Sequence, residues 1–418
     1  MPDRPGTDSR VREPGWRPAG KGGVNGSPSD PQRSAPPVAG RTGGFTESVI
    51  REMTRVAGEH GAINLAQGFP DFPAPDILKE AAIRAVHADL NQYAVTWGAP
   101  RLRRAIAATR ERDYGTPVDP DREVTVTCGA TEAMASALLA VAEPGDEVIV
   151  LEPFYENYGP DAVLCGARPV FVPMGPGPGL DLERIEGAFS DGTRAIILNT
   201  PNNPTGRVFT RQELEVLGGL CRRHEAWAIT DEIYEHILYE GEHVPMASLE
   251  GMDGCTITIS GASKTFSVTG WRVGWIVAPP GVTGAIRKVH DFLTVGAPAP
   301  LQDAVATALE GLGPEYYREL AGGYRERRGV LHHGLREAGF RCEPPAGAYY
   351  ILADFSALDG RDDDTFSRWL AAERGVAPVP GSSFFSEPDG GRDRVRFAFC
   401  KTVPTLEEAV RRLTGAAG

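Results

Sequence analysis

A lysine and an arginine, eight residues apart, offer the most distinctive chemistry of this chain. Lys264 lies in SGASKTFSVTGWRVGW (residues 260–275), directly after an apolar, β-branched run that is typical of a strand end. A buried lysine can become a neutral amine that forms an imine, which a guanidinium cannot do. The forked donors of Arg272 suit a phosphate. The segment therefore predicts a phosphorylated carbonyl cofactor held covalently by Lys264. A surface lysine in a loop is the alternative, which the small flanking residues Gly261 and Ala262 disfavour.

A second segment has the features of a phosphate cradle. The strand-like run EVTVTC ends in Gly129, Ala130 and Thr131, where a helix is expected to begin. A helix N-terminus offers unpaired backbone N–H groups and the positive end of the helix dipole, and the threonine adds a hydroxyl group. An ordinary helix cap is the alternative interpretation.

Two further predicted strands end in polar residues. In LNTPNNPTG (198–206) a proline-locked turn holds Asn202 and Asn203 after an apolar strand, although a plain Asn-Pro turn would read the same way. In AWAITDEIY, Asp231 and Tyr234 follow another apolar strand. A buried carboxylate needs a partner, and a protonated heterocyclic nitrogen would supply one; otherwise Asp231 caps a helix. Ligands of open α/β sheets bind where such strands end.

An arginine interrupts an apolar strand near the C-terminus. GRDRVRFAFCK places Arg396 between hydrophobic residues. Such an arginine either forms a structural salt bridge or binds a carboxylate with its fork. If a second domain closes over an imine site, Arg396 is expected to anchor the substrate.

Composition restricts the class of protein. The 418 residues exceed what one hydrophobic core usually supports, so two domains are expected. The net charge is −13, and the basic residues are dispersed, which disfavours nucleic acid as a partner. The six cysteines lie far apart without a CxxC pair, so neither a metal site nor a disulfide framework is indicated, and we expect buried thiols. No long apolar stretch or signal sequence indicates a membrane or secretion, so a cytoplasmic protein is expected.

The order of predicted elements indicates an α/β fold with two domains. Residues 1–42 are rich in proline, glycine and serine and are expected to form a disordered tail. Residues 43–75 predict a helix and an extended arm that pack with the small domain. Alternating strands and helices over 76–312 predict a large domain whose mostly parallel, seven-stranded-type sheet is covered by helices on both faces. Residues 313–418 predict a smaller α+β domain, completed by the N-terminal part.

As a set, these motifs resemble the fold type I aminotransferases of class I and II, which use pyridoxal 5'-phosphate (PLP). The resemblance is strongest to the kynurenine, glutamine and bacterial aspartate aminotransferase branch and extends from Phe45 to Leu413. The motifs that carry it follow in the order of the family: NLAQGFPDFPAP, NQYAVTWGAPRLRRAI, GDEVIVLEPFYENY, NTPNNPTG, TDEIY, SKTFSVTGWRVGW and RFAFCK.

The resemblance implies a role for each motif residue. Lys264 would attach to the cofactor and later move the proton of the substrate Cα, and Asp231 would hold the pyridine nitrogen protonated. The other implied cofactor contacts are Asn203 and Tyr234 at the phenolic oxygen, Tyr155 stacked on the ring, Gly129, Ala130, Thr131 and Arg272 at the phosphate, and Tyr93 reaching the phosphate from the second subunit of a homodimer with shared active sites. Arg396 would bind the substrate carboxylate, assisted by Asn203 and the backbone of Gly68.

One position departs from the family pattern. Many relatives carry a phosphate-binding serine three residues before the lysine, where this chain has Gly261, and either Ser260 or Ser263 could compensate. The expected side-chain pocket positions Ile50, Val295 and Gly296 are apolar or small, and no second arginine for a dicarboxylic substrate is evident. A neutral or aromatic amino acid is therefore the expected donor.

The implied reaction is transamination by a ping-pong mechanism, in which the α-amino group of an amino acid passes to a 2-oxo acid. The same residues would also serve a PLP enzyme that performs β-elimination, γ-replacement or oxidation. A PLP-sensing regulator is a more remote alternative, because the chain offers no basic helical module for DNA.

Overall fold

The computed structural model describes residues 38–175, 179–387 and 389–415. Most of the expected tail, residues 1–37, lies outside the described residues, and Gly40–Gly44 form a short 3-10 helix, η1. The described residues from 47 to 415 form one compact unit. Within the described residues, no helix has both the length and the apolar content needed to cross a bilayer.

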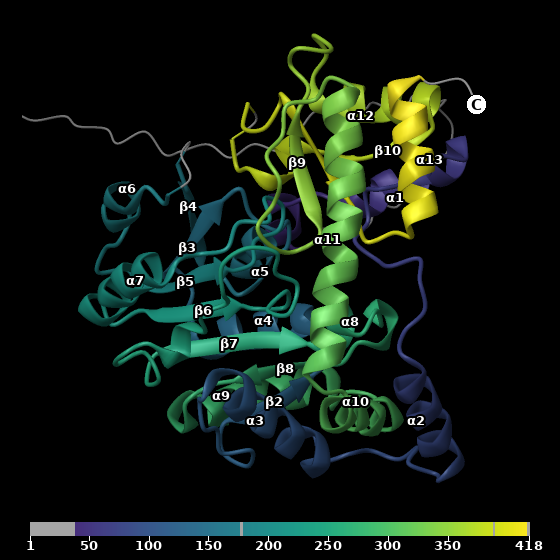
Figure 1. The fold of residues 1–418 in the computed structure, drawn as a ribbon. Coiled ribbons are helices and arrows are strands. Elements are labelled where there is room, and N and C mark those ends of the chain that lie inside the picture. The colour runs from purple at the N-terminus through teal and green to yellow at the C-terminus, as the bar shows by residue number, and fades with distance from the viewer. Residues whose placement is uncertain (1–37, 176–178, 388, 416–418) are drawn as a thin grey trace, which may run out of the picture. The chain divides into compact units, whose positions relative to one another are not determined.

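A seven-stranded sheet forms the centre of the compact unit (Figure 1). Its spatial order is β2-β8-β7-β6-β5-β3-β4, and β8 is antiparallel to both of its neighbours while the other pairs are parallel. The strands are β2 (Val124–Thr127), β3 (Glu147–Glu152), β4 (Arg168–Pro173), β5 (Thr193–Asn199), β6 (Trp227–Asp231), β7 (Thr256–Gly261) and β8 (Gly274–Val277). The predicted mostly parallel sheet is confirmed.

Helices cover both faces of this sheet because alternate strand residues point to opposite sides. Val148 and Val150 of β3 pack toward α4 (Ala130–Val141), α5 (Tyr158–Leu164) and α9 (Pro280–Thr294). Ile149 and Leu151 pack on the other side, toward α6 (Leu182–Glu186) and α7 (Arg211–Arg223). Three more helices enclose a further core around β2 and β8: α2 (Asp76–His87), α3 (Pro100–Tyr114) and α10 (Ala299–Gly311). Short helical segments are η2 (Met246–Ser248), α8 (Ala262–Thr265) and η3 (Thr269–Trp271).

The C-terminal part contains a second, antiparallel sheet of order β11-β12-β9. Its strands are β9 (Tyr350–Asp354), β11 (Val379–Pro380) and β12 (Arg394–Ala398), and its helical elements are α11 (Pro314–Glu337), α12 (Asp363–Trp369), the π-helical η4 (Leu370–Arg374), η5 (Gly381–Phe384) and α13 (Val403–Thr414). The N-terminal helix α1 (Val49–His60) packs on Ala371, Ala377 and Phe384, and β1 (Ile63–Asn64) pairs with β10 (Val376–Ala377). The domain boundaries near residues 75 and 312 stay a prediction.

The segment after β1, residues 65–72, is fastened to the second sheet and α13. Ala398 N donates to Leu65 O at 2.7 Å, and Lys401 Nζ donates to Phe69 O at 2.8 Å. The Asp71 carboxylate accepts from Thr402 N at 2.5 Å. These bonds hold the backbone of Gly68 beside the large sheet, where its carbonyl meets Lys264.

Candidate active site

The polar residues predicted at strand ends lie together at the carboxyl edge of the large sheet. Asn199, the last residue of β5, is opposite Asp231, the last residue of β6. The Asn199 amide donates to Asp231 O at 2.9 Å, and Asn203 N donates to Asn199 Oδ1 at 2.7 Å. Lys264 lies in α8, which follows β7 directly. Parallel strands thus bring the three predicted motifs to one place.

The amine of Lys264 lies in a largely enclosed aromatic site. Its Nζ is 3.4 Å from Gly68 O and 5.9 and 5.8 Å from the ring centres of Tyr234 and Tyr349. Burial, assisted by the positive charge of Arg272, lowers the pKa of Lys264 to about 8. A neutral amine is the form that attacks a carbonyl, so this environment favours imine formation near neutral pH.

The carboxylate of Asp231 is buried beneath this site. It accepts a hydrogen bond from Tyr158 Oη at 2.7 Å and one from Ile233 N at 3.2 Å. Burial raises the pKa of Asp231, while these two hydrogen bonds oppose that effect. None of the ion pairs among the described residues includes Asp231, so a protonated ring nitrogen would supply the charged partner that it lacks.

A glycine-lined turn faces the side chain of Arg272. Gly129 has φ +85° and precedes α4, whose first residues are Ala130 and Thr131. A Cβ at Gly129 would collide with the Arg272 guanidinium, so only glycine allows their close approach. The guanidinium of the exposed Arg272 donates to Thr269 O at 3.0 Å and to Cys128 O at 3.5 Å. The turn, the helix N-terminus and the arginine together place positive charge and backbone N–H groups where a phosphate would fit.

Arg396 is fully buried between aromatic rings. Its Nη1 donates to Asn203 Oδ1 at 2.8 Å and its Nη2 to Ala66 O at 2.5 Å. The ring centres of Tyr350 and Phe384 lie 4.2 and 4.9 Å from its guanidinium carbon. Its Nε has no hydrogen-bond partner among the described residues. A buried guanidinium without a carboxylate partner can accommodate one from a ligand.

The remaining predicted residues are placed as follows. Tyr234 is buried, and its hydroxyl is 3.0 Å from that of Tyr350. The half-buried Tyr155 packs edge-to-face against Tyr158, with ring centres 5.7 Å apart. Tyr93 is 89% exposed and lies at the surface of this chain.

Of the two serines that could replace a phosphate ligand at Gly261, Ser260 already has a hydrogen-bond partner. Ser260 Oγ donates to Glu235 Oε1 at 2.5 Å, in a buried cluster behind β7. Ser260 is therefore committed to that cluster. A side chain at Gly261 would be crowded, because its Cβ would lie 3.0 Å from Gly274 Cα and from Val273 O.

Two residues of the site, Tyr158 and Gly274, were not predicted from the sequence. Tyr158 follows Tyr155 by three residues in EPFYENY, a helical spacing that could have indicated a second inward-facing tyrosine. Gly274 packs closely against the turn at Gly129 that precedes α4, which we call the phosphate turn. A Cβ at Gly274 would lie 2.6 Å from Gly129 C and 2.7 Å from Ala130 N. No signal in a single sequence distinguishes such a glycine from any other strand glycine.

The site residues fit PLP on these observations. A lone buried carboxylate, a lysine with a lowered pKa and a glycine turn that faces an arginine lie around one space. Asp231, Lys264 and Arg272 would hold the ring nitrogen, the aldehyde carbon and the phosphate, respectively.

Comparisons with known proteins agree with this arrangement. Residues 60–413 match the family model of aminotransferase class I and II. The chain is 40% identical over 382 residues to a probable N-succinyldiaminopimelate aminotransferase DapC of Mycobacterium tuberculosis, covering 88% of this chain and 96% of the relative. It is 37% identical over 396 residues to human kynurenine–oxoglutarate transaminase 1, covering 87% and 94%. The solved structure of the N-succinyldiaminopimelate aminotransferase from Mycobacterium tuberculosis superimposes with a TM-score of 0.88 at 41% identity, covering 91% and 100%.

Proposed function

Because the chain belongs to the class I and II aminotransferase family and is a PLP-dependent transferase of amino groups, we propose that it performs this transfer with Lys264 and the residues around it. The alternatives of elimination, replacement, oxidation or a regulatory role are not favoured by the relatives, which are named as aminotransferases. The position of the lowered-pKa amine of Lys264 at the carboxyl edge of the sheet carries the assignment of the site.

We assign each contact of the cofactor to the residue whose chemistry suits it. PLP, when bound, supplies an electron sink for the bonds at the substrate Cα. Lys264 binds its aldehyde carbon, Asp231 its ring nitrogen, and Asn203 and Tyr234 its phenolic oxygen. Tyr155 stacks on the ring. The phosphate contacts are Gly129, Ala130, Thr131, Arg272 and Tyr93 of the partner subunit.

The substrate is oriented by residues on the opposite side of the site. Arg396 binds the α-carboxylate, with Asn203 and the backbone of Gly68 beside it. This anchor would orient the Cα–H bond toward Lys264, whose free amine would accept the Cα proton and deliver it to the carbon that carries the cofactor's aldehyde group. The buried guanidinium makes a charge-assisted bond that water cannot easily displace.

We propose a neutral or aromatic amino acid as the donor. The relatives differ in the substrates that their names give, which include kynurenine for the human protein and methionine for the Escherichia coli protein that is 38% identical. The expected pocket positions Ile50 and Val295 carry no charge, which supports an uncharged side chain.

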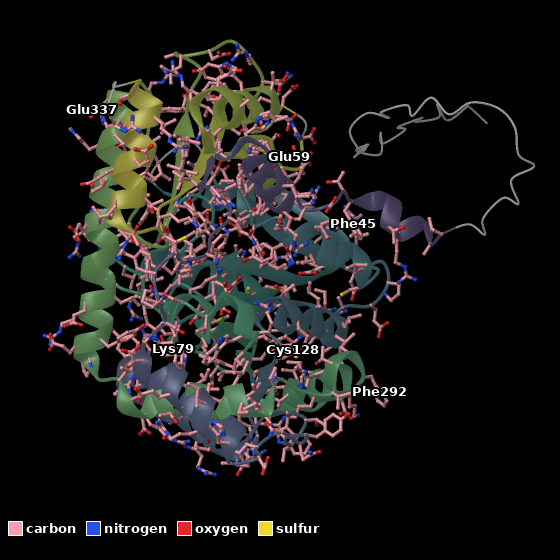
Figure 2. The ribbon with its side chains drawn as sticks, turned by 90° about the vertical axis from the view of Figure 1, so that its right-hand side faces the viewer. Phe45, Glu59, Lys79, Cys128, Phe292 and Glu337 are labelled. Atoms are coloured by element: carbon pink, nitrogen blue, oxygen red, sulfur yellow. The ribbon has the colours of Figure 1, made fainter. Side chains whose placement is uncertain are left out.

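We propose a homodimer that shares its active sites. Exposed hydrophobic side chains lie on two segments, residues 93–97 and 292–295, and Phe292 is 91% exposed at the surface (Figure 2). These segments are neighbours, because His290 Nε2 lies 2.8 Å from Thr96 O. A hydrophobic patch of this kind is typical of a protein interface, and it contains Tyr93. We place the enzyme in the cytoplasm, which the six free cysteines support.

A half-reaction screen tests the proposal. Purified holoenzyme is mixed with single amino acids, and pyridoxamine 5'-phosphate and the matching 2-oxo acid are quantified. We expect both in equal amounts for at least one neutral or aromatic amino acid, and neither with Lys264→Ala. Ammonia and an oxo acid without pyridoxamine 5'-phosphate would instead identify an eliminating enzyme. Trapping with borohydride at another residue would refute the site.

A further inference from the structure

A buried ionic cluster lies behind the site, on the side of the strands away from the substrate. Its members are Arg110 and Tyr114 of α3, Glu232 and Glu235 after β6, His243, and Ser260 of β7. Arg110 Nη1 lies 3.1 Å from Glu232 Oε2 and 3.4 Å from Glu235 Oε2. Arg110, Glu232 and Glu235 are all buried. Such a cluster is costly to desolvate, so a role beyond stability has to be considered.

The short segment at the end of β6 has side chains both in the candidate active site and in the buried cluster. Asp231 and Tyr234 lie in the candidate active site, whereas Glu232 and Glu235 enter the cluster. The contacts of Glu232 and Glu235 with the cluster therefore fix the same short segment that carries Asp231 and Tyr234 into the candidate active site.

The cluster also reaches the strand that carries the lysine. Glu235 accepts from Tyr114 Oη at 2.7 Å and from Ser260 Oγ at 2.5 Å, and Ser260 lies four residues before Lys264. Glu232 is further held by His243 Nε2 at 3.0 Å and Thr230 Oγ1 at 3.0 Å. One arginine thus links α3 to both β6 and β7, behind Asp231 and Lys264.

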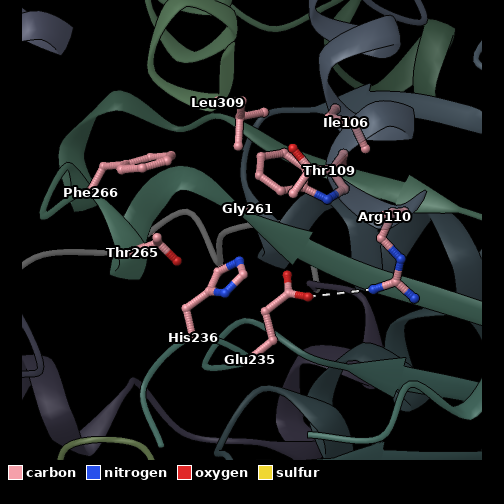
Figure 3. Close-up of a pocket in the computed structure, with 10 residues that line it drawn as sticks. Ile106, Thr109, Arg110, Glu235, His236, Gly261, Thr265, Phe266 and Leu309 are labelled. Carbon is pink, nitrogen blue, oxygen red and sulfur yellow. Dashed lines mark hydrogen bonds and ion pairs between the residues drawn. The ribbon is translucent and has the colours of Figure 1, made fainter. Parts of the chain in front are cut away.

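The cluster does not have the form of a ligand site. Glu232, Glu235 and His243 are close enough to hold a metal ion. However, the Arg110 guanidinium already pairs with both carboxylates and supplies their positive charge. Figure 3 shows its ion pair with Glu235. The adjoining cavity, lined by Arg110, Glu235 and His236, has a volume of about 10 Å³, enough for one water molecule.

Electrostatics keep Glu232 and Arg110 ionised. Burial would raise the pKa of Glu232, but His243 and Arg110 outweigh it and lower the pKa to about 2. Burial would likewise lower the pKa of Arg110, but the two carboxylates raise it. The ion pair between Arg110 and Glu232 consequently persists near neutral pH.

We infer that Arg110 is a positioning residue for cofactor binding, which acts through Glu232 and Glu235 on Asp231, Tyr234 and the Lys264 strand. This inference rests on the proposed roles of those three residues. Both contacts come from Arg110 Nη1, so one buried donor holds the two carboxylates side by side and thereby fixes the loop that carries them. In metal sites, loss of an outer contact that orients a ligand typically weakens binding by about 10- to 100-fold. We expect an effect of the same order here, a rise of roughly tenfold or more in the cofactor dissociation constant.

The test compares Arg110→Met with Arg101→Met. Arg101 lies on the same helix and also pairs with two carboxylates, Asp303 and Glu310, but these belong to α10. For each holoenzyme, the cofactor dissociation constant, the unfolding midpoint in urea and the pH midpoint of the visible absorption are measured. Removal of the buried positive charge at Arg110 favours protonated groups nearby, so its absorption midpoint is expected to move to higher pH. Arg110→Lys should restore part of the affinity.

A dissociation constant roughly tenfold or more above that of Arg101→Met, with a higher absorption midpoint, supports the inference. A smaller increase, or an unmoved midpoint, overturns it, even if Arg110→Met is less stable.

If Arg110→Met does not fold, Ser260→Ala decides, since it removes only the bond from β7 to Glu235. We then expect binding to be weaker by about threefold to tenfold, and a change of less than about threefold overturns the inference. If Lys264→Ala still carries covalent cofactor, the proposed site itself is wrong. If Lys264→Ala loses the covalent cofactor but Arg110→Met binds cofactor as tightly as its control, only this inference fails.

Discussion

The hydroxyl of Tyr158 donates a hydrogen bond to Asp231 Oδ2 at 2.7 Å. Both side chains are buried, and burial raises the pKa of Asp231, whereas this bond opposes the increase. Asp231 must be ionised to hold a protonated ring nitrogen, so the tyrosine favours the active form of the carboxylate.

Tyr158→Phe should move the acidic limb of the kcat/KM profile to higher pH. The lost bond leaves burial less opposed, so the pKa of Asp231 rises further. One hydrogen bond corresponds to a shift of about 0.5 to 1 pH unit. Tyr239→Phe is the control, because Tyr239 is equally buried but donates to Ala348 O. An unchanged limb in Tyr158→Phe would contradict the assignment of Asp231.

The cofactor should attach to the apoprotein at a rate that rises through pH 8. The pKa of Lys264 is lowered from an ordinary 10.5 to about 8. About one tenth of the amines are therefore neutral at pH 7, against less than a thousandth at an ordinary lysine. Stopped-flow absorbance after mixing apoprotein with PLP gives this rate. A midpoint above pH 10 would show that the amine is not activated by burial.

Much of this site could be predicted from the sequence because its residues stand at strand ends. Short apolar stretches, typical of strands, precede Gly129, Asp231 and Lys264. The residues that follow each stretch have functional groups that a simple turn would not require. What could not be predicted depends on contacts across the chain. Ser260 faces Glu235 rather than the phosphate turn, and Arg110 meets residues more than a hundred positions away. Local patterns carry no information on such pairs.

Arg396→Gln should weaken amino-acid binding far more than cofactor binding. The guanidinium is buried and its Nε is unpaired among the described residues, so a substrate carboxylate would lose its charged partner. Loss of a buried charge-assisted fork costs about 2 to 4 kcal/mol, and kcat/KM should fall accordingly by about 30- to 1000-fold. Arg396→Lys, which keeps the charge, should retain part of the activity. Equal loss of cofactor affinity would contradict the role of a substrate anchor.

Phe292→Asp should produce a monomer that binds PLP weakly. The side chain is 91% exposed and belongs to the patch that we propose as the dimer interface. A carboxylate there would be buried without a partner, which destabilises association. Sedimentation gives the mass, and equilibrium dialysis gives the cofactor affinity. Leu164→Asp is the control, since Leu164 is also exposed but lies at the end of α5. A dimeric Phe292→Asp would place the interface elsewhere.

Gly274→Ala should impair phosphate binding without unfolding the sheet. An added Cβ would lie 2.6 Å from Gly129 C and 2.7 Å from Ala130 N, and backbone atoms cannot yield as a side chain can. The turn that precedes α4 must therefore move away from Arg272. Because the N–H groups of a helix N-terminus bind a phosphate only when they converge on it, affinity for PLP should fall by at least about tenfold.

The matched control is Gly270→Ala, which lies in the same segment but has no atom within 4 Å of its added Cβ. Titration of each apoprotein with PLP and with pyridoxal, which lacks the phosphate, separates the two contributions. Gly274→Ala should lose affinity for PLP and change little toward pyridoxal, because only the phosphate contacts the displaced turn. An equal loss for both compounds would mean that the glycine supports the sheet as a whole, and the phosphate would then bind away from Gly129.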